Sequence, residues 1–235
     1  MTLFMRYTLK HTHKYWRLIT SSIVFLGLFS LIVRKIADSD IWYHLSIGRE
    51  IFQTRRIPEL EFLVFPNIGE IAELHEWAYG LLMFLVHKIS GINGLGFANA
   101  LIGTTILFIL YRLSVSRSHK FIPAVFTLAF ILVMIDLRLS YRPEMILFLA
   151  LSCEIYCLER YSDARKIKWL IFLPCIALLL AQFHPSVIIL LVVWTLYGFQ
   201  FLWDDRKNPT KLRKSIFTHG TFCLLTASLS LFITY

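Results

Sequence analysis

The chain has 235 residues, of which 57% are hydrophobic and 17% are charged, and its formal net charge is +9. Soluble domains are about 45–50% apolar, and the excess here comes in blocks of roughly 15–20 residues, which is the length of a membrane-spanning helix. This composition excludes an ordinary soluble enzyme and predicts an all-α, polytopic transmembrane helix bundle forming one domain over residues 1–235. We attribute the basic excess to cytoplasmic loops and expect no nucleic-acid partner.

Apolar segments able to cross a membrane follow one another along the chain. The first, 18–33, precedes Arg34-Lys35 instead of a small-residue cleavage site, so it is expected to stay as an anchor. The long run 167–203 must turn at His184-Pro185, because proline disfavours helix in the residue before it. The sequence ends within an apolar run, which suggests a truncated chain. The expected spans are about 18–33, 92–112, 121–136, 144–158, 167–183, 185–203 and 216–235.

Two further stretches are predicted to lie flat at the membrane surface. Residues 39–53, SDIWYHLSIGREIFQ, place Ile41, Leu45, Gly48 and Phe52 on one face of an amphipathic helix. Residues 77–88 contain an apolar run that would rise only about 15 Å as a helix, too little to cross a core of about 30 Å. We expect both to be interfacial helices of a first outer loop, 34–91.

The distribution of lysine and arginine selects the topology. With 77–88 flat and a cytoplasmic N-terminus, 16 of the 24 lysine and arginine residues fall on the cytoplasmic side. With 77–88 spanning the membrane, only 7 do. Because cytoplasmic loops carry the excess of positive charge, the sequence predicts the first arrangement, a multi-pass protein of the inner (plasma) membrane.

This topology gathers the polar side chains of three separate outer loops on one face of the membrane. Each has a simpler explanation when taken alone: aspartates cap helices, and histidine or arginine can place a polar tip at the interface. Charges at the membrane border are nevertheless costly unless paired or used, so the combination predicts a site. Its members are Asp38, Asp40, His44, His75, Glu76, Arg138, Arg142 and His184, with Glu144 at the edge.

The outer loop also resembles a known family. The run Asp38-x-Asp40-x-Trp42-Tyr43-His44-Leu45, followed by Gly48, Ile51, Ile57-Pro58 and His75-Glu76-Trp77, is similar to the first outer loop of bacterial membrane glycosyltransferases of the GT-C fold. These enzymes are related in architecture to protein O-mannosyltransferases and aminoarabinose transferases. Further similarities are GINGLGFANAL at 91–101, YRPEM at 141–145 and AQFHPS at 181–186.

The resemblance implies transfer of a sugar from a polyprenyl-phosphate donor to an acceptor at the outer face. It places the catalytic carboxylate of the first outer loop at Asp38 or Asp40. This carboxylate is expected to act as a base or as a ligand of a divalent cation (Mg or Mn). The sequence departs from the family in having Glu59 or Glu61 where an aspartate is expected after Ile57-Pro58. It also has Gln-Phe-His-Pro at 182–185 where Asn-x-His-Gly is expected, and about half the usual length.

The chemistry of such a transfer assigns a role to each group. A carboxylate must accept the proton of the acceptor hydroxyl, and we expect Asp40 to do so, with Asp38 as its rival or a metal partner. Arginine forks suit the departing phosphate, which points to Arg138 and Arg142, supported by His184. The remaining substrate-binding candidates are His44, His75 and Glu76, the last two to orient the sugar or acceptor.

Two alternatives stay open from the sequence. A transporter or flippase component would also place charges among membrane helices, although no internal repeat is evident and the charges gather at one face. A non-catalytic or truncated membrane subunit, acting with a partner subunit, would explain the short chain.

Overall fold

The computed structural model describes residues 19, 21–33, 38–72, 74–118 and 141–234, with side chains described up to residue 228. Within these residues the fold is all-α, as the sequence predicts, and the only strand-like pairing is an isolated antiparallel bridge between Leu60 and Ile71. The expected span 121–136 and the candidate Arg138 lie outside the described residues. The helices are Ser21–Ile32, α2 (Asp40–Thr54), α3 (Trp77–Ser118), α5 (Glu144–Ala164), α6 (Lys168–Phe183), α7 (Val187–Asp205) and α8 (Pro209–Thr234).

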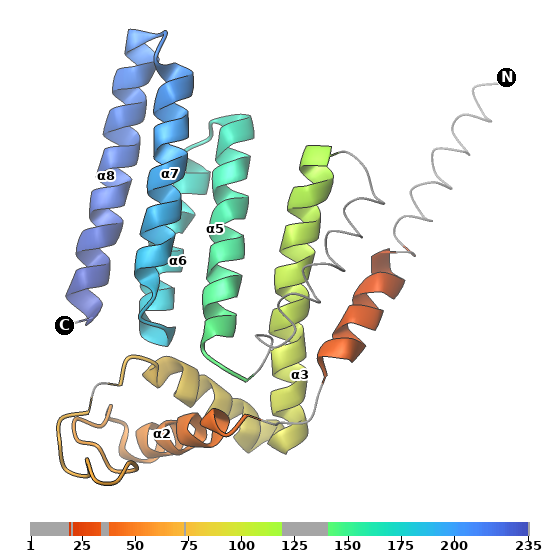
Figure 1. The fold of residues 1–235 in the computed structure, drawn as a ribbon, viewed down its shortest axis with the longest axis vertical. Helices are drawn as coiled ribbons and strands as arrows, with labels where there is room; N and C mark the ends of the chain where they lie inside the picture. Colours follow the sequence, from red (N-terminus) through yellow and green to blue (C-terminus); the bar gives the residue numbers. More distant parts are fainter. Residues whose placement is uncertain (1–18, 20, 34–37, 73, 119–140, 235) are drawn as a thin grey trace, which may run out of the picture.

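The long helix α3 consists of two limbs that meet at Gly91. Gly91 has φ 63° and ψ −160°, a conformation that only glycine adopts without strain. The first limb, 77–90, lies across one end of the molecule, whereas the second limb, 92–118, runs upright beside α5 (Figure 1). The break therefore falls between the two segments that the sequence separates, 77–88 and 92–112.

Helix α2 packs against the first limb of α3 at the same end (Figure 1). Its buried face contains Ile41, Leu45 and Gly48, three positions of the predicted apolar stripe, whereas the fourth, Phe52, is partly exposed. The two helices approach closely where Gly48 faces Gly80: a Cβ added at Gly48 would overlap the Gly80 carbonyl oxygen. The pair of glycines thus fixes two flat helices in one layer, which we call the flat layer (α2 with residues 77–90).

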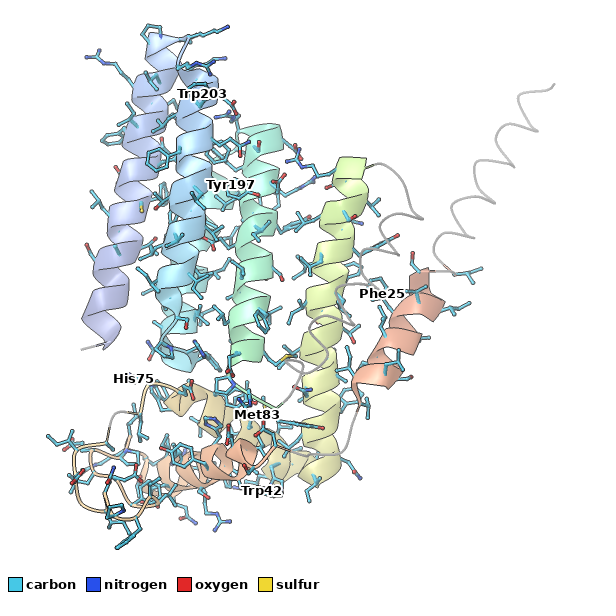
Figure 2. All side chains as sticks on the ribbon, viewed as in Figure 1. Phe25, Trp42, His75, Met83, Tyr197 and Trp203 are labelled. Carbon is cyan, nitrogen blue, oxygen red and sulfur yellow. The ribbon has the colours of Figure 1, made fainter. Side chains whose placement is uncertain are left out.

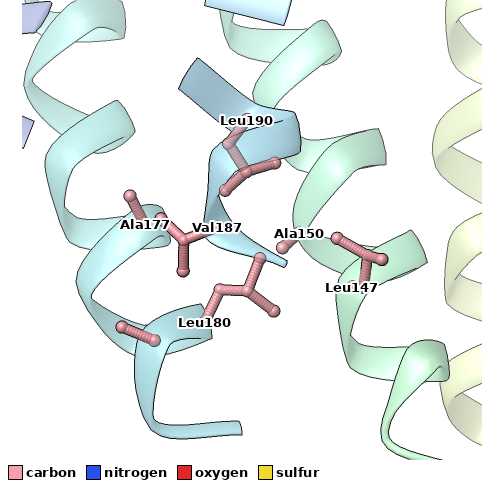
Figure 3. Packing of buried hydrophobic residues seen from close by; sticks show 7 residues of the cluster. Leu147, Ala150, Ala177, Leu180, Val187 and Leu190 are labelled. Atoms are coloured by element: carbon pink, nitrogen blue, oxygen red, sulfur yellow. The ribbon is translucent and has the colours of Figure 1, made fainter. Parts of the chain in front are cut away.

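Helices α5, α6, α7 and α8 stand upright at this layer, whereas Ser21–Ile32 is tilted (Figure 1). Helices α5, α6 and α7 pack through small and branched apolar side chains, and this cluster is seen from close by in Figure 3. Its members are Leu147, Ala150, Ala177, Leu180, Ala181, Val187 and Leu190. Helix α6 ends as predicted at the His184-Pro185 turn, where His184 takes an extended conformation with φ −161°.

Two of the described helices are long and apolar enough to cross a membrane, judged by length and composition: Trp77–Arg117 and Val187–Asp205. Helices Ser21–Ile32 and Lys168–Phe183 are apolar but shorter. Helix α5 continues to Ala164 instead of stopping near 158, and its last turns carry charged residues. Helix α8 begins at Pro209 instead of 216 and includes three basic residues in its first turns. A bundle of seven spans is thus not shown.

Candidate functional site

The candidate residues lie where helices meet the flat layer. Asp38 precedes α2, Glu76 precedes α3, Arg142 precedes α5, and His184 ends α6. Each is therefore held by a helix terminus and not by a free loop. Figure 2 shows His75, Met83 and Trp42 at this end, and Tyr197 and Trp203 towards the other. We call this region the flat-layer site, comprising Asp38, Asp40, His44, His75, Glu76, Arg142 and His184.

Arg142 joins the two aspartates that the sequence singles out. Its Nε lies 2.5 Å from Asp38 Oδ2, and a terminal nitrogen lies 3.2 Å from Asp40 Oδ2. The Arg142 guanidinium holds the pKa of the Asp38 carboxyl below its ordinary value, and Asp38 in turn raises the pKa of Arg142. Residues 104 positions apart in the sequence thus form one ion-paired cluster.

The two aspartates differ in side-chain exposure and in hydrogen bonding. The Asp38 side chain is only 12% exposed, and its Oδ1 also accepts the backbone N–H of Asp40 at 3.1 Å. Asp38 therefore serves α2 in the way a helix cap does, while Ser39 makes no capping hydrogen bond through its side chain. The Asp40 side chain is 52% exposed and keeps oxygen surface open to solvent.

Glu76 stands between two histidines from other elements. Its Oε2 is 3.7 Å from Nε2 of His44, and its Oε1 is 3.7 Å from Nε2 of His184. Nδ1 of His184 accepts the backbone N–H of Ser186 at 3.1 Å, so in the neutral ring the proton sits on Nε2, facing Glu76. These distances exceed a hydrogen bond, and a small adjustment of Glu76 would make one.

Burial favours the uncharged forms of Glu76, His44 and His184. Burial raises the pKa of Glu76, and the nearby Glu144 carboxylate raises it further. Burial lowers the pKa of His44 and of His184 below the ordinary value for histidine. His44 is 4% exposed, packs edge-on against the ring of Tyr79, and its Nδ1 has no hydrogen-bond partner. These shifts favour the uncharged forms of the three side chains, which can donate hydrogen bonds to a ligand as well as accept them.

A cavity of about 190 Å³ opens beside Glu76. Its volume is below the roughly 300 Å³ at which pockets for whole small molecules begin, so it suits one ring or headgroup of a larger ligand. Arg142 and the aspartates lie outside its lining, next to the Glu76 group. The lining residues are Tyr43, His44, Ile47, Leu74, His75, Glu76, Trp77 and Pro185.

Three aromatic residues without a predicted role also belong to this region. Tyr43 and Trp77 line the cavity, and Tyr79 supports His44. Sequence periodicity does not reveal that Tyr43 and Trp77 border one cavity, because they belong to different helices. Glu61 instead serves its own loop, because its Oε1 accepts the backbone N–H groups of residues 62–64.

A divalent cation does not fit between the aspartates as they stand. The Arg142 guanidinium already occupies the position that a cation shared by Asp38 and Asp40 would take. Across the described residues, no group of three or more His, Cys, Asp or Glu side chains is placed to hold a metal ion. The cation that the two aspartates share is therefore a protein group, the Arg142 guanidinium.

The flat-layer site combines an anion-binding arginine, an accessible carboxylate and a carboxylate set between two imidazoles. Such a set can bind a phosphate or carboxylate group, accept a proton and orient hydroxyl groups. Comparisons with protein-family models, with curated proteins and with solved structures found no match for this chain.

Proposed function

We propose that the chain is a membrane glycosyltransferase of the GT-C type, transferring a sugar from a polyprenyl-phosphate donor to an acceptor at the outer face of the membrane. The observation that carries the proposal is the Arg142 cluster with Asp38 and Asp40, held beside a cavity where two flat helices meet the ends of upright ones. A lipid-linked substrate needs this placement, since its headgroup must reach a polar site while its tail stays in the bilayer.

The proposed membrane placement sets the bundle across the inner membrane with its N-terminus in the cytoplasm and the flat layer at the outer surface. The upright limb of α3 and helices α5, α6, α7 and α8 run side by side at a steep angle to that layer, as such a placement requires (Figure 1). The charged last turns of α5 and the basic first turns of α8 would then emerge on the cytoplasmic side, in accord with the positive-inside rule.

In the proposed reaction Asp40 acts as the base. It accepts the proton of the acceptor hydroxyl as that oxygen bonds to the anomeric carbon, and the bond from that carbon to the phosphate oxygen breaks. Asp38 is the weaker choice, because it is mostly buried and held by Arg142 and by the backbone of Asp40. The reaction is then a single direct displacement of the phosphate by the acceptor oxygen.

Arg142 is the proposed phosphate ligand. Its guanidinium points at the exposed face of Asp40, so the departing phosphate can pair with the same cation near the base. Glu76, flanked by His44 and His184, would bind hydroxyl groups of the sugar or acceptor in the adjoining cavity, with His75 in its wall.

The proposal is tested by mass spectrometry of lipid extracts from cells with and without the gene. Cells lacking it should accumulate a sugar-bearing polyprenyl phosphate, which then serves as donor in a vesicle assay. Asp40→Asn should reduce transfer by at least about 100-fold. The matched control is Asp204→Asn, at an aspartate of similar exposure (48%) that also faces an arginine, far from the site. Equal activity of the two variants would exclude Asp40 as the base.

The membrane orientation is tested separately, by cysteine labelling. In a chain whose four native cysteines are replaced, Asn67→Cys in the exposed outer loop should react with an impermeant thiol reagent added to intact cells. Lys207→Cys, in the exposed turn between α7 and α8, should react only after the membrane is opened. The reverse pattern would overturn the orientation.

A further inference from the structure

A second cavity, which we call the cleft, lies away from the flat-layer site, between the upright limb of α3 and helices α5 and α6. Its volume is about 560 Å³, within the range of pockets that hold lipids and other small ligands. Its wall is aromatic and aliphatic, and two of its rings, Phe108 and Phe172, are about half exposed on the outside of the helices. Lining residues include Phe108, Arg112, Cys157, Trp169, Phe172 and Ile176.

Cations surround this apolar cleft. Arg112 is part of the lining. The Arg160 guanidinium lies 5.9 Å from the ring centroids of both Tyr156 and Trp169, and Lys168 Nζ lies 5.0 Å from that of Trp169. Because Tyr156 and Trp169 both line the cleft, Arg160 and Lys168 lie at its border.

These cations differ from their neighbours in having no acidic partner. Within the described residues, Arg112, Arg160 and Lys168 form no ion pair, whereas Arg117 and Arg165 in the same region each contact two carboxylates. Of the acids nearby on α5, Glu159 and Asp163 are already taken up by Arg117, and Glu154 is buried inside the bundle, 2% exposed, with no ion pair among the described residues. The cleft therefore combines an apolar wall with uncompensated positive charge.

We propose that this cleft binds an anionic membrane phospholipid, with an acyl chain along the aromatic wall and the phosphate between Arg112, Arg160 and Lys168. Basic pockets between membrane helices on the cytoplasmic side suit such headgroups, and the proposed orientation puts these residues on that side. The lipid is distinct from the sugar donor, whose site is at the other end of the bundle. The inference rests on the proposed membrane placement and not on the transfer reaction.

The test uses the full chain purified in detergent and titrated with phosphatidylglycerol or phosphatidylcholine of identical acyl chains, with bound lipid counted by native mass spectrometry. The wild-type protein should retain phosphatidylglycerol at least tenfold more tightly. The triple variant Arg112→Gln, Arg160→Gln, Lys168→Gln should lose at least tenfold of that affinity. The control triple Lys207→Gln, Lys211→Gln, Lys214→Gln removes the same charge from exposed positions elsewhere and should keep the affinity.

A second variant probes the wall without altering charge. Cys153→Trp places a large ring in the cleft and should also weaken phosphatidylglycerol binding. Equal retention of the two lipids by the wild-type protein, or equal losses in the two triple variants, would overturn the proposal. The triple variants replace exposed side chains and decide the matter even if Cys153→Trp does not fold. Labelling at Asn67 and Lys207 reports separately on the membrane placement, and vesicle transfer on the reaction.

Discussion

Arg142 and Arg117 each hold two carboxylates, but they do so at opposite ends of the helix bundle and in different surroundings. Arg117, in the last turn of α3, contacts Glu159 and Asp163, which lie one helical turn apart on α5. Glu159 is also bound by the hydroxyl of Tyr197 at 2.6 Å. This cluster ties α3, α5 and α7 together, and the carboxylates that it contains are bound by protein groups.

At the flat-layer end, the polar groups are only partly used. Asp40 is half exposed, Glu76 lies beyond hydrogen-bond distance of both histidines, and Nδ1 of His44 has no partner. A cavity adjoins them. The same arginine motif therefore fastens helices at one end and leaves binding capacity open at the other, and this contrast can be tested at three levels.

The largest expected effect is on activity. Arg142→Gln should lower sugar transfer by at least about 100-fold, because it removes the cation that would stabilise the departing phosphate. Arg117→Gln should leave transfer within a few-fold of wild type, since its contacts join helices only. Transfer is measured in vesicles with the lipid-linked donor found by mass spectrometry. Equal losses would mean that both arginines are structural.

The next effect is on the packing of the flat layer. Gly48→Ala should destabilise the protein by about 1–3 kcal/mol, because the new Cβ overlaps the Gly80 carbonyl oxygen. Gly198→Ala in α7, where an added Cβ meets nothing within 4 Å, should instead stabilise it by about 0.5–1 kcal/mol. Thermal unfolding in detergent measures both. Similar values for the two variants would contradict the close crossing of α2 and α3.

The smallest expected effect concerns pH. The pKa of Asp38 is lowered in the folded protein, so its pairing with Arg142 stabilises the fold above the ordinary value of 3.8 and is lost as the pH falls through the folded pKa. Asp38→Asn should thus cost about 1–2 kcal/mol at pH 7, and this cost should shrink as the pH falls below 3.8. Asp163→Asn should cost less than about 1 kcal/mol, because the Asp163 side chain is 45% exposed. A pH-independent cost at Asp38 would exclude the ion pair as its cause.

Much of the fold could be predicted from local pattern. Helix α2 was expected over 39–53 and spans Asp40–Thr54, because its apolar stripe is regular and Arg55, Arg56 and Pro58 end it. The turn at His184-Pro185 follows from proline sterics. Helix α5 extends beyond its predicted end near residue 158. The charged residues Glu159 and Asp163 favour a loop when read from the sequence, but in the structure both pair with Arg117.

The start of α8 had a local signal that hydropathy ignores. Pro209 suits the first helical position, and Asn208 Oδ1 accepts the backbone N–H of Lys211 at 3.2 Å, as a capping residue does. The pairing within the site had no such signal. Asp38 and Arg142 meet only because α2 lies flat and α5 begins directly above it, and sequence spacing gives neither angle nor distance.

Gly91 joins the two parts of the molecule through a single residue. Residues 77–90, which carry Tyr79 beneath His44, continue through this one joint into the upright limb that packs on the N-terminal helix and α5. Because a single residue separates the limbs, a change in the backbone angles of Gly91 would shift Glu76, at the start of the flat limb, relative to His184 at the end of α6. The geometry of the cavity beside Glu76 therefore depends on the angle between the two limbs of α3.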